Sequence, residues 1–279
     1  MLVPLKEVRC AVGRWLDDKP LVGVVGLPAL PGSPAHRGES LQEVAERAAD
    51  DAMAYAAAGF DAIMLQNVGD RPATAAAGPE TVAWMTAVGL QVRAACALPC
   101  GVSVLKNDAR AAIAIAQVLQ AEFVRVKVWV GAMVGPEGIL EGVAADALRY
   151  RAAIGAQTVA IWADVHDRTG VPLGQDSLEH CAIEAVNFGM ADAIIVTGRS
   201  ERETLEWLSR AKDAVGSTRV LVGGGVTPAN VDAMLVHADG VVVATAVKYA
   251  ADLLNPVDHE AARQMATAVT RARDRARRA

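Results

Sequence analysis

Short apolar runs alternate with longer amphipathic stretches along the whole chain, and this alternation predicts the order of its elements. The apolar runs are mostly β-branched and are followed by polar or glycine-rich loops, which is typical of strands buried on both faces. The predicted strands are LVGVVGL (21–27), DAIMLQ (61–66), CGVSVL (100–105), FVRVKVWV (123–130), TVAIWADV (158–165), ADAIIVT (191–197), RVLVG (219–223) and DGVVVA (239–244).

Cap signals mark the ends of the amphipathic stretches. Ser40, with Glu43 three residues later, has the sequence of a capping box, and Gly59 is placed to end the same helix. The same scheme predicts helices over SLEHCAIEAVNFG (177–189), over SERETLEWLSRAKDAVG (200–216) and over about 256–278, the last with Asn255 as its cap and Pro256 at its first position.

Eight predicted strands, each followed by a predicted helix, favour an α/β fold of the (β/α)8 TIM-barrel type, which typically takes about 250 residues. No linker or change of composition divides the 279 residues, so a single domain is expected over 1–279, with 1–20 preceding the first strand. A doubly wound open sheet is the alternative. That fold usually has fewer strands and carries its phosphate loop after the first strand, whereas the glycine run here follows the seventh.

Composition and charge narrow the classes of partner. Hydrophobic residues make up 53% of the chain, enough to bury a large core. The net charge of -5 gives no reason to expect nucleic acid or an anionic membrane as a partner. The basic run RARDRARRA at the end suits the negative end of a helix dipole, with a binding patch as the other interpretation. The sequence leaves a homo-oligomer open.

Export signals are not evident in the sequence. The opening MLVPLKEVRCAVGRW lacks the basic start and continuous apolar stretch of a signal peptide. No segment reaches the ~18 uninterrupted apolar residues needed to cross a membrane. Cysteines at positions 10, 96, 100 and 181 show neither metal-site spacing nor the density of a disulfide scaffold. A reduced, cytoplasmic location is therefore expected.

The glycine run in VLVGGGVTPAN (220–230) predicts that a ligand approaches its backbone, because three glycines cost conformational entropy and pack nothing. In TIM barrels a phosphate site is frequently built from the loops after strands 7 and 8 and a helix N-terminus, here expected at 227–228. The predicted phosphate-binding residues are Gly223, Gly224, Gly225, Thr245 and Ala246. The alternative is that the glycines serve only a tight turn.

Alternation along two strands predicts charged side chains inside the barrel. Arg125, Lys127 and Trp129 share one face of their strand, while Trp162, Asp164 and His166 share a face of the next. The predicted catalytic residues are Asp164 as general base, His166 as acid or electrophile, and Lys127 to neutralise an enolate or form a Schiff base. In the alternative, Asp164 and His166 merely bind loops and Lys127 forms a structural ion pair with Asp164.

Polar residues at other strand ends are predicted to bind the substrate. They are Asn67, Lys106, Asn107, Arg125 and Thr197, although Lys106 and Asn107 could instead only start a helix. The remaining histidines, at positions 36, 180, 237 and 259, lack partners at ligand spacing, so no metal and no cofactor is expected.

Further motifs lie along nearly the whole chain: GVVGLPALPGSP (23–34), DAIMLQNVGD (61–70), GVSVLKNDA (101–109), FVRVKVWVGAMV (123–134), EGILEG (137–142), ADVH (163–166), GGGVTP and ATAVK. With these motifs the chain resembles the BtpA/SgcQ family, which is named after a photosystem I biogenesis protein and a protein linked to sugar metabolism. The resemblance implies a TIM barrel, in agreement with the strand count.

The chain departs from the family pattern at several strand ends. Family members usually carry a histidine where this chain has Gly26 and a glutamate where it has Gln66, and they tend to have asparagine at Ser103 and Lys127. After ADVH they commonly continue with a lysine and a second histidine, whereas here the run is DRTG (167–170). Because glycine and glutamine cannot transfer protons at neutral pH, altered or weakened chemistry is expected.

Two classes of function follow. The preferred one is an enzyme that acts on a phosphorylated sugar or similar small carbonyl compound by acid/base chemistry at the C-terminal face of the barrel. It would be an isomerase or an aldolase-type lyase, with glycosyl or phosphoribosyl transfer as a variant. The alternative is a non-catalytic assembly or regulatory factor of the BtpA type that retains a phosphate-binding barrel. The substitutions at positions 26 and 66 favour the alternative, whereas the two phosphate loops favour the enzyme.

Overall fold

The computed structural model describes residues 14–174 and 177–278. Two expectations, the lack of a signal peptide and the reduced state of Cys10, concern residues 1–13 and so lie outside the described residues. No helix within it is both long and apolar enough to cross a membrane.

Eight parallel strands close into a barrel in the order β1-β11-β10-β9-β7-β4-β3-β2. Each strand lies within a run that the hydrophobic pattern predicts, so the TIM-barrel expectation is confirmed. The strands are β1 (Leu21–Gly26), β2 (Ala62–Gln66), β3 (Cys100–Ser103), β4 (Phe123–Val126), β7 (Ala160–Val165), β9 (Ala193–Val196), β10 (Arg219–Val222) and β11 (Val241–Val243).

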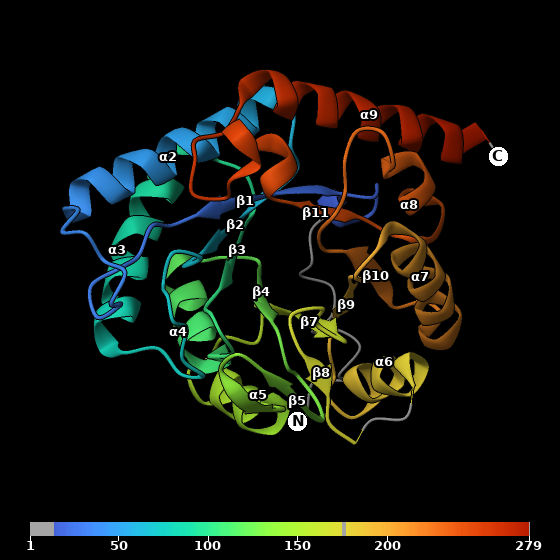
Figure 1. Ribbon diagram of the computed structural model, residues 1–279, viewed down its shortest axis with the longest axis horizontal. Helices are drawn as coiled ribbons and strands as arrows, with labels where there is room; N and C mark the ends of the chain where they lie inside the picture. The colour runs from blue at the N-terminus through green and yellow to red at the C-terminus, as the bar shows by residue number, and fades with distance from the viewer. Residues whose placement is uncertain (1–13, 175–176, 279) are drawn as a thin grey trace.

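An outer ring of helices surrounds the strands, as Figure 1 shows in a view along the barrel. Each barrel strand is followed by one α-helix within the described residues, and the apolar face of each helix covers the outer faces of the strands. The helices are α2 (Leu41–Ala58), α3 (Pro79–Ala95), α4 (Ala109–Leu119), α5 (Ala144–Ala153), α6 (Leu178–Asn187), α7 (Glu201–Val215), α8 (Val231–His237) and α9 (His259–Arg278).

The predicted cap of α2 is present. The Ser40 hydroxyl accepts from the amide of Glu43, whose carboxylate accepts from the amide of Ser40. Gly59 ends the helix in the left-handed conformation with φ 89°. Two further predicted serines, Ser177 and Ser200, cap α6 and α7 in the same way with their hydroxyls.

The start of α9 differs from the prediction. The helix begins at His259, and the Asp258 carboxylate accepts from the amides of Glu260 and Ala261. Pro256 lies before the helix, and its carbonyl accepts the amide of Tyr249 in the segment after β11. An aspartate cap therefore replaces the predicted asparagine–proline start.

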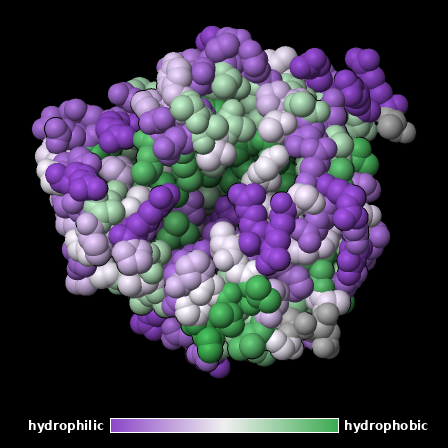
Figure 2. Space-filling view, viewed as in Figure 1, coloured by the Kyte–Doolittle hydropathy of each residue, from purple (hydrophilic) through white to green (hydrophobic). Residues whose placement is uncertain are grey.

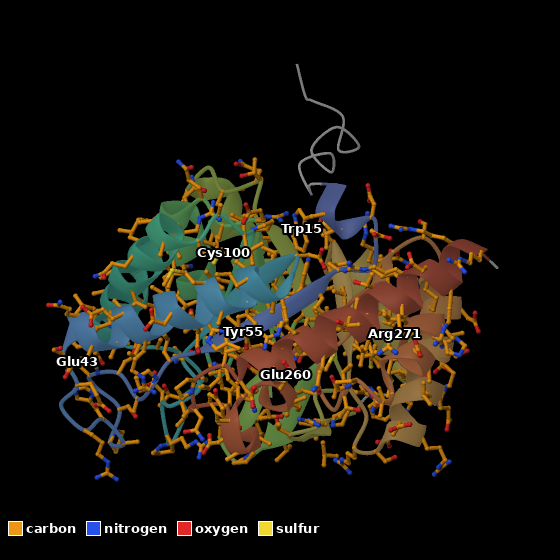
Figure 3. The ribbon with its side chains drawn as sticks, turned by 90° about the horizontal axis from the view of Figure 1, so that it is seen from above. Trp15, Glu43, Tyr55, Cys100, Glu260 and Arg271 are labelled. Carbon is orange, nitrogen blue, oxygen red and sulfur yellow. The ribbon has the colours of Figure 1, made fainter. Side chains whose placement is uncertain are left out.

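Aromatic rings fill the amino-terminal end of the barrel. Phe123 of β4 and Trp162 of β7 stack with their ring centroids 3.7 Å apart. Trp15, in the short 3-10 helix η2 (Arg14–Leu16), packs against both rings at 6.0 and 6.1 Å. Figure 3 shows Trp15 at η2, on the side of the barrel opposite the loop that follows β1. These three rings close the amino-terminal end, so a ligand would enter the barrel at the carboxyl ends of the strands, which we call the mouth.

A small antiparallel sheet, in the order β6-β5-β8, covers part of that mouth and was not predicted. Its strands are β5 (Ala132–Gly135), β6 (Gly138–Glu141) and β8 (Val171–Pro172). They belong to the loops after β4 and β7. The predicted strand over 123–130 therefore ends at Val126, because the chain leaves the barrel to form this sheet.

The small sheet is apolar on both faces. Met133 and Leu140 pack inward with Val128. On the outer face, Val134 pairs with Ile139 and with Val171, and these side chains are exposed. The row accounts for the hydrophobic patch at the lower edge of Figure 2, below the hollow at the barrel mouth.

Candidate active site

The alternation of β4 and β7 brings Arg125 and Asp164 together inside the barrel, as predicted. Arg125 Nε donates to Asp164 Oδ1 and Nη2 donates to Oδ2, both at 2.8 Å. Both residues are buried. Burial by itself would lower the pKa of Arg125, but the adjacent Asp164 carboxylate outweighs it and raises that pKa above its ordinary value. The result is a bidentate buried ion pair.

Lys127 completes the coordination of Asp164. Its Nζ donates to Asp164 Oδ2 at 2.7 Å, so both oxygens of this carboxylate are occupied by cations. The ion pair that the sequence offered as an alternative is therefore present. Three of the roughly four acceptor sites of this carboxylate are thus used by Arg125 and Lys127.

A second carboxylate, Asp167, lies next to this pair and was missed by sequence reasoning. It is 3.7 Å from the ammonium groups of both Lys127 and Lys106, and it accepts the amide and hydroxyl of Thr169. Burial would raise the pKa of Asp167, but the two lysines and the Thr169 amide outweigh it and lower the pKa to about 2. A charged residue two positions after the end of β7 was the signal.

Lys106 connects Asp167 to the hairpin between β5 and β6. Its Nζ donates to Thr169 Oγ1 at 2.6 Å and lies 3.6 Å from Glu137 Oε1. Glu137 was also missed, although it opens the quoted motif EGILEG. The charged groups at this side of the mouth form what we name the mouth cluster: Lys106, Arg125, Lys127, Glu137, Asp164 and Asp167.

His166 leaves the inner face of its strand, contrary to the alternation, although it lines the same small cavity as Lys127 and Asp164. Its φ of 53° turns the chain at the end of β7, so the side chain leaves the inner face. Nε2 lies 3.2 Å from Cys181 Sγ on α6, and the ring packs edge-on against Trp207 of α7. Burial, with the nearby Arg210, lowers the pKa of His166. The imidazole thus sits between two outer helices.

Asn67 and Asn107 hold loops instead of facing the mouth. Asn67 Oδ1 accepts the amide of Leu105, and its amide nitrogen donates to Asp70. Asn107 accepts the amide of Val128 and donates to the carbonyls of Val128 and Glu141. Their hydrogen-bonding groups are used by the protein, so they position the loops that carry the mouth cluster.

The glycine loop after β10 presents unpaired backbone amides. Gly223 donates to Val196 O at 3.3 Å, but within the described chain Gly224 and Gly225 donate to no protein acceptor. These two residues have φ of 135° and 71°, which glycine adopts without strain. In the adjacent loop after β11, the amides of Thr245 and Ala246 are likewise unpaired among the described residues.

The expected helix start at 227–228 contributes less. The amide of Thr227 already donates to Asn230 Oδ1 at 2.8 Å, and α8 begins only at Val231. The side chain of Asn230 thus occupies an amide that the sequence assigned to an anion. The candidate amides are those of the two loops and not those of a helix end.

Thr197 faces the glycine loop with a hydroxyl that has no protein partner in the described chain. The residue is 7% exposed. A Cβ placed on Gly223 would lie 3.2 Å from Thr197 Oγ1 and 3.1 Å from Arg125 Nη2, so glycine is needed to keep this space open. A buried hydroxyl without a partner is costly and indicates a missing polar group.

Two positions that depart from the family pattern, Gly26 and Gln66, provide no group for proton transfer. A Cβ at Gly26 would lie 2.9 Å from Leu253 O and from Val68 Cγ2, so a histidine has no room there. Gln66 Nε2 donates to Ser103 Oγ at 3.1 Å in a buried pair. The last residues of β1 and β2 therefore carry no titratable group, and the mouth cluster lies on the β4 and β7 side.

The small sheet closes the charged side of the mouth. Between it and the barrel lies a cavity of about 20 Å³, whose lining includes Lys127, Asp164, His166, Asp167, Met133, Pro172 and Cys181. A ligand pocket for a small molecule typically measures about 300 Å³ or more, so this space holds about one water molecule. A sugar phosphate could occupy this space only if the sheet moved outward.

A closed parallel barrel with charged side chains and free amides at the carboxyl ends of its strands defines a TIM-barrel protein. Residues 17–271 match the BtpA family, and the chain belongs to that family. It is 39% identical to an uncharacterized protein of Pyrococcus horikoshii, over 92% of this chain and 98% of the relative. It is 36% identical to the photosystem I biogenesis protein BtpA of Synechocystis, over 86% and 84% of the two chains.

Solved structures share the fold at low sequence identity. Tryptophan synthase from M. tuberculosis superimposes with a TM-score of 0.59 and 15% identity, over 96% of this chain and 99% of that one. Phosphoribosyl anthranilate isomerase from Thermococcus kodakaraensis gives a TM-score of 0.53 and 13% identity, over 91% and 99%. At such identities the likeness shows the barrel alone.

Proposed function

We propose that the protein is an enzyme that acts on a phosphorylated sugar or similar small carbonyl compound by proton transfer at the mouth of the barrel. Isomerisation and aldol-type cleavage both need such a transfer, and glycosyl or phosphoribosyl transfer would use the same phosphate anchor. The observation that carries the proposal is the pair of loops with unpaired amides at Gly224, Gly225, Thr245 and Ala246.

The loops suit a phosphate group. Backbone amides in neighbouring loops form a concave donor set for an anion, and β10 and β11 are adjacent strands. The Arg168 guanidinium adds positive charge, since its Nη2 lies 3.3 Å from the position of a Cβ on Gly224. Two similar folds carry the names of enzymes of phosphorylated compounds, thiamine phosphate pyrophosphorylase and phosphoribosyl anthranilate isomerase.

The mouth cluster supplies the charge for the reaction. When a proton leaves the carbon next to a carbonyl, the electron pair forms an enolate whose negative charge rests on the oxygen. Lys127, held in place by Asp164, is the cation that neutralises this oxygen, and the Thr197 hydroxyl donates to a polar group of the ligand. The ion pair favours this role of Lys127 over a Schiff base, which needs a free amine.

Thermal shifts test the phosphate site. Inorganic phosphate and a panel of sugar phosphates should raise the melting temperature of the wild type, because a ligand selective for the native state stabilises it. Gly224→Asp should abolish the shift through charge repulsion. Gly224→Ala is the matched control, since it imposes the same backbone strain at φ 135° without the charge, and it should retain a shift. No stabilisation by any phosphorylated compound would overturn the proposed function.

A non-catalytic assembly or regulatory factor is the second candidate. It is supported by the packed surroundings of Gly26 and the Gln66–Ser103 pair, which leave two strand ends without a titratable group, and by the name of the Synechocystis relative. Sugar phosphates that bind but undergo no exchange of carbon-bound hydrogen in D2O would favour this candidate over the enzyme.

A further inference from the structure

Glu137 differs from the other carboxylates of the mouth cluster. Asp164 has both oxygens on Arg125 and Lys127, and Asp167 is held by two lysines and Thr169. Glu137 Oε2 is buried and has no hydrogen-bond partner in the described chain. Within the described part of the cluster it is therefore the carboxylate with an oxygen that accepts no hydrogen bond.

The hairpin between β5 and β6 turns Glu137 toward the mouth. The residue occupies the two-residue turn with Pro136, between the paired residues Gly135 and Gly138. A Cβ on Gly135 would lie 2.9 Å from Glu137 Oε2, so the missing side chain lets the carboxylate fold back over the hairpin. The other oxygen lies 3.6 Å from Lys106 Nζ.

Lys106 fixes this placement from the barrel side. Its ammonium donates to Thr169 and lies near Asp167, which is also 3.7 Å from Lys127. A short path of alternating charges thus runs from Glu137 to Lys127, the cation proposed for the oxyanion. An enolisation requires a base for the carbon-bound proton and a cation for the oxygen, and this charged path contains one of each.

We infer that Glu137 is the proton-transfer residue of this enzyme, which removes a proton from the carbon next to the carbonyl of a phosphorylated ketone or aldehyde and returns it to the product. The inference rests on the proposed function. The C–H electron pair becomes the enolate double bond, the carbonyl pair moves to the oxygen beside Lys127, and Glu137 becomes a neutral carboxylic acid. Its return of the proton regenerates the carboxylate, so no other reactant is consumed.

The position of Glu137 on the hairpin also gives it a way to meet the substrate. The cavity beneath the small sheet is too small for a sugar phosphate and is not lined by Glu137, so the inference places the ligand there with the hairpin displaced outward. Its return would bring Glu137 onto the ligand and exclude water, as closing loops do in many enzymes. In this account Glu137 reaches the substrate only when the hairpin has closed over it.

Affinity labelling tests the inference with bromohydroxyacetone phosphate, a phosphorylated ketone with a reactive carbon beside its carbonyl. A carboxylate at the proposed position attacks the bromomethyl carbon, forms an ester and releases bromide. Mass spectrometry of the wild type should find the label on Glu137, and excess inorganic phosphate should suppress it. Glu137→Gln should lose the label, whereas Glu141→Gln, an exposed glutamate of the same hairpin, should keep it.

Thermal shifts with inorganic phosphate, measured on the same samples, separate the two claims. A phosphate shift together with no label on Glu137, or with an unchanged label in Glu137→Gln, overturns the inference and leaves the phosphate site intact. The absence of a phosphate shift overturns the proposed function and the inference with it. Identification of the labelled residue in the wild type does not depend on the folding of any variant.

Discussion

At the residue scale, the three carboxylates of the mouth cluster differ in the cations that they contact. Asp164 accepts three charge-assisted hydrogen bonds, which fix the direction of Arg125 and Lys127. This geometry favours a positioning role for Asp164 over the role of general base that its sequence position suggested. Buried cations need such a partner, since each would otherwise lose its hydration without compensation.

Asp167 should make stability depend on pH in acid. Its pKa of about 2 lies below the ordinary value of 3.8, so the ionised form stabilises the folded state above pH 3.8. This contribution, on the order of 2 kcal/mol, is lost as the pH falls from about 4 toward 2. Denaturant unfolding should show that the free energy of unfolding of the wild type exceeds that of Asp167→Asn near neutral pH. This difference should become smaller as the pH falls from about 4 toward 2.

A control separates this effect from general acid sensitivity. Asp213→Asn, at an exposed position of α7, should change stability by less than about 0.5 kcal/mol at every pH. A constant difference between the wild type and Asp167→Asn from pH 5 to pH 3 would contradict the low pKa and the ion pairs that cause it.

At the element scale, α2 anchors the loop that is proposed to bind phosphate. Lys248 follows the 3-10 helix η3 (Thr245–Val247), is buried, and donates to Asp51 of α2. Asp51 also accepts the amide of Val257 at 2.8 Å, so one carboxylate ties both ends of the segment to the helix. Burial lowers the pKa of Lys248, and the Asp51 carboxylate opposes that effect. The amides of Thr245 and Ala246 are held in place by this contact.

Removal of the Lys248 charge should loosen that segment. Lys248→Met keeps most of the side-chain volume but leaves Asp51 without its cation, so hydrogen exchange of the amides over 245–257 should accelerate. Arg263→Met removes an exposed ion pair with Glu260 on α9 and should leave the exchange unchanged. Equal exchange over 245–257 in Lys248→Met and the wild type would show that the contact does not hold the loop.

At the scale of the whole molecule, the barrel gathers distant residues at one end. The stacked rings of Phe123 and Trp162 fill the amino-terminal end, and β4, β7, β9, β10 and β11 place their polar ends at the other. The charge lies on the β4 and β7 side, while the free amides lie on the β10 and β11 side. A ligand with a phosphate at one end and a carbonyl at the other fits this division.

Sequence patterns could predict the strands and helices of the barrel, because alternation and capping depend only on residues near in sequence. Alternation placed Arg125 inside the barrel correctly, and capping residues located α2, α6 and α7. The same rule failed for His166, since a positive φ ended the alternation one residue after β7. Local dihedral angles of that kind leave no periodic signal.

The candidate site was less predictable because its contacts join separate loops. Glu137 and Asp167 meet through Lys106 only after the hairpin and the loop after β7 fold together into the small sheet. In the sequence, Asn230 looks like an ordinary helix cap, and nothing there indicates that its side chain accepts the amide of Thr227. Such pairings depend on tertiary geometry and are not visible in the order of residues.

A crystal structure determined with inorganic phosphate tests the central claim most directly. The account predicts one anion bound by the amides of Gly224 and Gly225 and those of Thr245 and Ala246, with the Arg168 guanidinium beside it. An anion bound elsewhere on the barrel, or these amides filled by other groups of the protein at saturating phosphate, would contradict it.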